Sequence, residues 1–152
     1  MNKLLVAAAL VAATAVGAGF LAAARAAGPT CTAFVGGLQA DKTSIPELVV
    51  FNTSGSPQPL DLVLRAPDGT ALVTLPAALT VNGQQTATLD LRAQLAHAGT
   101  NGKAYSGVFT AEVTGAAPFS EATAVVHVTQ YFGSRKKPKA GFVVRPVFSL
   151  AN

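Results

Sequence analysis

Leu60-Asp61-Leu62-Val63-Leu64-Arg65 is followed by Pro67-Asp68-Gly69 and then by Ala71-Leu72-Val73-Thr74-Leu75. Strict alternation places the leucines of the first run on one face of a strand and its charged residues on the other. Proline, aspartate and glycine favour a tight turn, because glycine adopts positive φ at no steric cost. The stretch 60–75 therefore predicts a β-hairpin with one buried face.

Similar short runs of β-branched and aromatic residues extend this pattern along the chain. We expect further strands at 47–51, 80–81, 85–91, 105–113, 122–131 and 142–148, and a weaker one near Cys31–Val35. Asn82-Gly83 predicts a second hairpin between 80–81 and 85–91, and Pro146 suits an edge strand or a bulge. About seven short strands separated by turns are typical of a sandwich or a barrel.

The spacing of these strands resembles an immunoglobulin-like or fibronectin-III-like antiparallel β-sandwich, over roughly residues 30–149. The resemblance is architectural, since a single Cys and the absence of Trp exclude the paired cysteines and core tryptophan of true immunoglobulin domains. It is similar to the Ig-like modules of bacterial cell envelopes, and it identifies no specific family. We predict an all-β fold, a single sandwich of about seven strands, preceded by an N-terminal hydrophobic export helix.

The N-terminus has the pattern of a secretory signal peptide. Met1-Asn2-Lys3 is a basic start, and the 21 residues Leu4–Ala24 carry no charge. Ala24-Arg25-Ala26 is a small-x-small site that a signal peptidase could cut, which would leave Ala27 as the new N-terminus. The chain is then expected in the periplasm or outside the cell.

An uncleaved membrane anchor is the alternative for residues 1–26. Twenty-one helical residues would span about 31 Å, close to the hydrocarbon thickness of a bilayer. Lys3 would keep the N-terminus in the cytoplasm, so the remainder would lie on the exoplasmic side of the inner membrane. In both cases we expect an extended lead-in at 27–45, with room for a first strand, and the sandwich domain at 46–152.

The inventory of reactive side chains points away from catalysis. His97 ends a short helical turn predicted at 90–98, and His127 lies on a predicted strand. Their positions lack the spacing of a metal site, and the seven acids are scattered singly. We therefore expect no enzyme activity, no cofactor and no metal; a secreted hydrolase is the least favoured alternative.

Cys31 is the single cysteine of the chain. An odd cysteine in an oxidising compartment is a candidate for an intermolecular disulfide. The alternative, which we favour, is a partly buried small apolar residue.

A basic cluster stands out between Gly133 and Gly141. Its four cations are Arg135, Lys136, Lys137 and Lys139. We expect a loop that projects from the sheet, because these charges cannot be buried. The loop is a candidate contact for a protein or an anionic envelope surface; a solubilising role is the alternative. Nucleic acid is not expected, since no recognisable binding motif accompanies the cluster.

The charge distribution singles out the same region. The net charge is +4, but without Lys3 and Arg25 nine cations oppose seven acids, and five of these cations fall between 135 and 145. We expect an exported, non-catalytic binding or scaffolding module of the bacterial cell envelope. The alternatives are a membrane-anchored accessory subunit of a larger complex, with membrane contact through residues 4–24, and a structural subunit of a surface polymer that uses an exposed edge strand.

Overall fold

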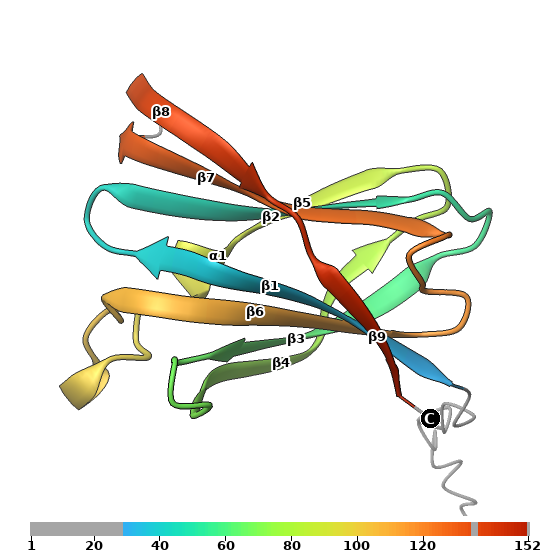
Figure 1. Cartoon of the computed structure of the whole chain (residues 1–152), viewed down its shortest axis with the longest axis horizontal. Coiled ribbons are helices and arrows are strands. Elements are labelled where there is room, and N and C mark those ends of the chain that lie inside the picture. Colours follow the sequence, from blue (N-terminus) through green and yellow to red (C-terminus); the bar gives the residue numbers. More distant parts are fainter. Residues whose placement is uncertain (1–28, 135–136, 152) are drawn as a thin grey trace, which may run out of the picture.

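The computed structural model describes residues 29–134 and 137–151, and within them the chain forms nine strands (Figure 1). The strands are β1 (Thr30–Ala40), β2 (Ser44–Asn52), β3 (Gln58–Arg65), β4 (Ala71–Val81), β5 (Thr86–Asp90), β6 (Gly107–Ala116), β7 (Ala124–Ser134), β8 (Lys137–Val144) and β9 (Val147–Ala151). A short helix α1 (Leu91–Gln94) and a 3-10 turn η1 (Thr100–Gly102) connect β5 to β6.

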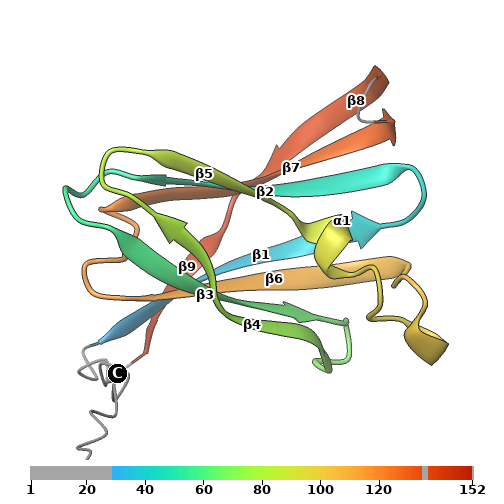
Figure 2. The same cartoon turned by 180° about the vertical axis from the view of Figure 1, so that it is seen from behind.

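The strands form two packed antiparallel sheets, which confirms the all-β sandwich. In the described part of the chain, sheet A has the order β4-β3-β6-β1-β9 and sheet B the order β5-β2-β7-β8. Figure 2 shows the same two layers from behind, with α1 at one end. The export segment at residues 1–26 lies outside the described residues, among which no helix is long and apolar enough to cross a bilayer.

The hairpin predicted at 60–75 is present as β3 and β4. Leu60, Leu62 and Leu64 are at most 2% exposed, and they face the core as the alternation predicted. Gly69 takes a φ of 86° at the turn, where its N–H donates to the Ala66 carbonyl at 2.9 Å. The local pattern therefore determined this hairpin.

The expected weak strand near Cys31–Val35 is longer and more central than its sequence indicated. β1 lies between β6 and β9 in sheet A, and its alternate residues Cys31, Ala33 and Val35 are at most 2% exposed. Part of the expected lead-in at 27–45 thus contributes directly to the core. The signal was weak because small residues and two glycines occupy much of this strand.

The second predicted hairpin is wrong. Asn82-Gly83 joins β4 of sheet A to β5 of sheet B, and in the described structure these strands do not pair with each other. The buried Asn52 amide donates to the carbonyl of Val81 at 3.0 Å, and Gly83 lies so close to Gly55 that an added Cβ would be 2.5 Å from the Gly55 backbone. These contacts tie the turn to the β2–β3 loop, so that it crosses between the layers.

The last predicted strand, 142–148, is also wrong as one element. β8 ends at Val144 in sheet B and β9 starts at Val147 in sheet A, so the chain changes sheets at Arg145–Pro146. Pro146 marks a crossover here, whereas we expected an edge strand or a bulge.

Candidate interaction site

The basic cluster lies at the turn between β7 and β8. Arg135 and Lys136 fall outside the described residues, and so do the side chains of Lys137 and Lys139. The backbone of these two lysines belongs to β8, where Lys137 is in register with Ser134 of β7. Much of the expected projecting loop is therefore paired strand, because β7 continues to Ser134.

This turn lies at the end of the sandwich opposite the start of β1. Gly133 donates to the Thr43 carbonyl at 2.7 Å, so the end of β7 lies beside the β1–β2 turn. At the other end, Thr30 is in register with Ala151 of β9. The eleven residues of β1, at about 3.3 Å each, separate these ends by roughly 36 Å. Figure 1 shows the β7–β8 pair at the upper left and the end of β9 at the lower right.

Cys31, the candidate for an intermolecular disulfide, lies in the core with 2% of its surface exposed. Burial raises the pKa of the Cys31 thiol, and the negative charge of Glu121 raises this pKa further. A raised pKa disfavours the thiolate that disulfide chemistry requires. A bond to a second chain would also require β1 to move away from the core.

The two histidines are not brought together. His97 follows α1, with its Nδ1 3.2 Å from the Gly102 carbonyl oxygen, whereas His127 lies on β7 in sheet B. Among the described residues, no group of three His, Cys, Asp or Glu side chains could hold a metal ion.

The change of sheets after β8 leaves two strands half-paired. β8 pairs with β7 as far as Val128 and Val144, and the next hydrogen-bonding position would place Pro146 opposite Val126. Proline has no N–H to donate, so the ladder ends there. In the described structure, β9 then pairs with β1 only from Thr30 to Phe34. Residues 35–40 of β1 and residues 124–127 of β7 are therefore unpaired on this side, and we call each of these stretches a half-edge.

The half-edge of β1 is closed by a side chain of the same molecule. The Gln130 side chain, 1% exposed, accepts a hydrogen bond from the Gln39 N–H and donates to the Gln39 carbonyl, both at 3.1 Å. A bulge in the β1–β6 ladder between Val35 and Leu38 distorts the same stretch of β1, and Gly37 adopts a φ of 70° there. An amide side chain and a bulge together satisfy and blunt this edge.

The half-edge of β7 is left open as a groove of about 510 Å³. It is lined by Glu121, Ala124, Val125, Val126, His127, Val143, Arg145, Pro146 and Phe148. Arg145 follows β8 and lies opposite His127 by extension of the β7–β8 register. Phe148 comes from sheet A, so both layers contribute to the groove.

The charged groups of this groove have few internal partners. Arg145 has no acidic partner among the described residues. Arg65, which lies outside the groove, is by contrast paired with Glu112 at 2.8 Å. Glu121 lies beyond the start of β7, at the other end of the groove. The groove therefore has a cation at one end, a carboxylate at the other and apolar side chains between them.

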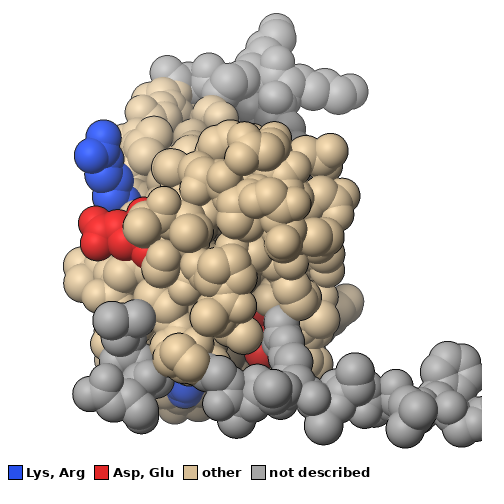
Figure 3. All heavy atoms as spheres, turned by 90° about the vertical axis from the view of Figure 1, so that its right-hand side faces the viewer, with Lys and Arg blue, Asp and Glu red and all other residues tan. Residues whose placement is uncertain are grey.

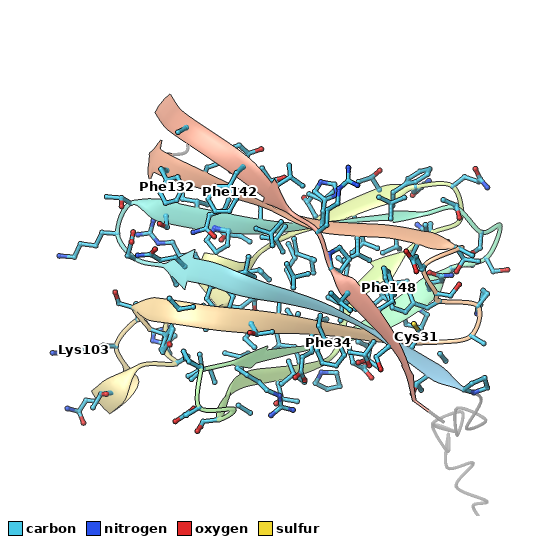
Figure 4. The ribbon with its side chains drawn as sticks, in the orientation of Figure 1. Cys31, Phe34, Lys103, Phe132, Phe142 and Phe148 are labelled. Carbon is cyan, nitrogen blue, oxygen red and sulfur yellow. The ribbon has the colours of Figure 1, made fainter. Side chains whose placement is uncertain are left out.

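Exposed apolar side chains gather around the same crossover. Of six large hydrophobic residues exposed in the described part of the chain, five lie on or beside the segment 142–148 or line the groove. These five are Phe34, Val125, Phe142, Val143 and Val147. Figure 4 shows the labelled Phe132, Phe142, Phe148 and Phe34 along the line of β8 and β9. Phe34 and Val147 are paired on the outer face of sheet A, whereas Val125 and Val143 lie on the outer face of sheet B, so exposed apolar side chains flank the crossover on both sheets.

A second groove, of about 520 Å³, lies at the end near α1. Its polar groups have internal roles: Asp90 caps α1 by accepting from the N–H groups of Arg92 and Ala93, and Arg92 donates to the Lys42 carbonyl at 3.3 Å. This groove is consequently a weaker candidate for a ligand.

The sequence interpretation missed Val126, Gln130 and Arg145 as contributors to a site. Nothing in their local sequence distinguishes them, because each contributes to the site only by its place next to an unpaired part of a sheet. Pro146 was the available signal, since a proline within a strand-like run can end a ladder.

Comparison with known proteins supports the fold alone. No protein-family model and no curated protein matches the chain. The crystal structure of Thermotoga maritima 1070 is similar, with a TM-score of 0.54 and 10% sequence identity. The alignment covers 80% of this chain and 95% of that one.

Proposed function

We propose that the chain is an exported, non-catalytic binding or scaffolding module of the bacterial cell envelope. The observation that carries the proposal is that the start of β1 and the start of β8 lie at opposite ends of the sandwich. Thr30 and Ala151 are paired at one end, while Lys137 begins β8 at the other end. A domain tethered or exported through its N-terminus would thus present its basic cluster away from that terminus.

The distance between these two ends of the sandwich narrows the choice of partner. If residues 4–24 remain in a membrane, the five residues from Arg25 to Pro29 reach at most about 18 Å when extended, and β1 adds about 36 Å in the direction that the chain takes. The basic cluster then faces a protein or an anionic surface across the compartment, rather than the lipid headgroups beside its own anchor.

We also propose that the sandwich is of the immunoglobulin-like type. In that fold, strands A-B-E-D form one sheet and G-F-C the other. The order β9-β1-β6-β3 and the order β8-β7-β2 support this assignment, with β1, β2, β3, β6, β7 and β8 in the places of B to G. The C-terminal strand β9 occupies the place of strand A, and β4 and β5 are additions between D and E.

A membrane-anchored accessory subunit is the second candidate. The loops at the end where Thr30 and Ala151 lie are 53–57, 82–85 and 117–123, and together they carry one charged residue, Glu121. Figure 3 views this end and shows few charged side chains on it. Such an end suits contact with a membrane surface or with a neighbouring subunit.

The intact mass of the natively expressed protein tests the choice between these two. A chain that begins at Ala27 supports the cleaved, exported module and rules out the anchored subunit; a chain that begins at Met1 excludes cleavage and supports the anchored subunit. The measurement is independent of any partner.

Substitution tests the contact. The double variant Lys137→Ser and Lys139→Ser should weaken co-purification of the native partner about tenfold at low salt, with a smaller effect at high salt. The control is Lys103→Ser, which removes one exposed cation at the turn before β6. An equal loss per lysine removed would reduce the effect to net charge and contradict the proposed contact.

A further inference from the structure

We propose that the open half-edge of β7 binds an extended peptide from a partner protein, added as a short strand antiparallel to β7. The peptide would carry an acidic residue where it meets Arg145 and a basic residue where it meets Glu121. This inference deepens the proposed binding function, on which it rests, by assigning a binding mode and a ligand chemistry to a second site.

The main chain of β7 offers the hydrogen-bonding groups. Thr53 donates to the Thr123 carbonyl and Gly133 to the Thr43 carbonyl, so the odd residues of β7 bond to β2. Antiparallel ladders alternate, and the N–H and C=O of Val126 therefore point to the other side, into the groove. No strand pairs with Val126 on that side among the described residues.

The space limits the length of the added strand. The unpaired part of β7 is Ala124 to His127, four residues, or about 13 Å at 3.3 Å per residue. Arg145 and Pro146, which line the groove, bound this space on one side, and the Ala124 N–H, which donates to the Ser120 carbonyl at 3.0 Å, bounds it on the other. A short extended segment fits, whereas a long edge strand of a second folded copy would meet these two boundaries.

The side chains define the preferred sequence. Val125 and Val143 are 53% and 56% exposed on the outer face of sheet B, and Phe148 closes the groove from sheet A. Alternate side chains of an added strand would cover these apolar groups on its two faces. A strand that continues the direction of β8 has its N-terminal end beside Arg145 and its C-terminal end beside Glu121.

The half-edge of β1 is the internal comparison that favours this site. There, Gln130 already occupies the amide and carbonyl of Gln39, so an incoming strand would first have to displace a buried side chain. No equivalent side chain is hydrogen-bonded to Val126 in the described structure. These two half-edges therefore differ in accessibility, and in the described structure the main-chain groups of the β7 half-edge are the ones free to pair.

A synthetic peptide tests the proposal on the purified full chain. Its ends are acetylated and amidated, and it has aspartate first, lysine last and alternating valine and threonine between them. We expect saturable binding by calorimetry, with NMR shifts centred on the amides of Val126 and His127. Methylation of the peptide amides that face β7 should weaken binding at least about tenfold, while methylation of the alternate amides should change it by less than about twofold. Equal effects of the two methylations would overturn strand addition.

Charge substitutions test the ligand chemistry. Arg145→Gln should weaken binding of this peptide about fivefold, whereas the control Lys103→Gln, at an exposed cation elsewhere, should leave it within about twofold. A peptide with its two charges exchanged should also bind more weakly. If the exchanged peptide binds equally well, the assigned orientation is wrong.

The Lys137→Ser and Lys139→Ser chain separates this inference from the proposed function. It should retain peptide binding while it loses the native partner at the basic cluster. Peptide binding that fails in the unmodified chain overturns the groove proposal and leaves the basic contact standing.

Discussion

The chain crosses between the two sheets at both sides of the sandwich, and the two crossings differ in how they are closed. At the β4–β5 crossing, the fully buried Asn52 side chain donates to the carbonyls of Val81 and Ser56, at 3.0 and 2.7 Å. At the β8–β9 crossing, Arg145 is exposed and Val147 is 72% exposed beside a groove. A buried network of hydrogen bonds thus closes the β4–β5 crossing, whereas the β8–β9 crossing leaves an open groove. We call the first the sealed crossing and the second the open crossing.

This difference separates stability from binding. A sealed crossing has its polar groups satisfied inside the protein, so its residues contribute to folding. An open crossing leaves main-chain and charged groups available to a partner. Substitutions at the sealed crossing should therefore lower stability, while those at the open crossing should affect binding.

Removal of the Asn52 side chain is expected to have the largest effect. Asn52→Ala leaves the Val81 carbonyl without this donor in the interior, and should lower the free energy of unfolding by about 3 kcal/mol. Urea denaturation measures the change. The neighbouring exposed Thr53→Ala is the control and should change stability by less than about 0.5 kcal/mol. A similar small change for Asn52→Ala would show that the network does not seal the crossing.

Gly83→Ala should have the second largest effect on stability. A Cβ at Gly83 would lie 2.5 Å from the backbone carbon and oxygen of Gly55, which forces the two loops apart. We expect a loss of about 2 kcal/mol in thermal or urea unfolding. Gly55→Ala is a matched control, because its Cβ would meet nothing within 4 Å. Equal losses for the two variants would mean that close loop packing is not the cause.

Gln130→Leu would convert the closed half-edge of β1 into an open one. The loss of two hydrogen bonds to Gln39 should cost about 1.5 kcal/mol of stability. The exposed edge should also promote self-association, which sedimentation velocity would detect as larger species. A variant that stays as stable as the original and unchanged in size would contradict the role assigned to Gln130.

Asp41→Asn should have the smallest effect, at the β1–β2 change of sheets. The Asp41 carboxylate accepts from the Thr43 N–H, the Thr43 hydroxyl and the Ser44 N–H, and the Thr43 backbone bond is the main cause that lowers the Asp41 pKa. We expect a loss of about 1 kcal/mol at neutral pH.

The stabilisation by Asp41 should depend on pH in a defined direction. Because the folded pKa of Asp41 lies below its unfolded value, the stabilisation is fully present above the unfolded pKa, about 3.9. It is lost as pH falls through the folded pKa. Urea midpoints of the two proteins should therefore converge with acidification below about pH 4. A difference that persists unchanged to lower pH would exclude the carboxylate as the stabilising group.

The sequence by itself determined many of the strands and turns. Alternation in Leu60–Leu64 placed the core face of β3, because successive side chains of a strand point to opposite faces. The turn at Gly69 followed from its tolerance of positive φ. Both are consequences of backbone geometry within a few residues, and such consequences are visible in a single short stretch.

Only the tertiary structure decided which sheet each strand joins. Asn82-Gly83 reverses the chain in either case, but Asn52 and Gly55 from a different loop direct the next strand into sheet B. Pro146 ends the β8 ladder, and β1 then receives β9. Sheet membership depends on contacts between residues far apart in the sequence. For the same reason Val126, whose local sequence is that of an ordinary buried strand residue, borders the open groove.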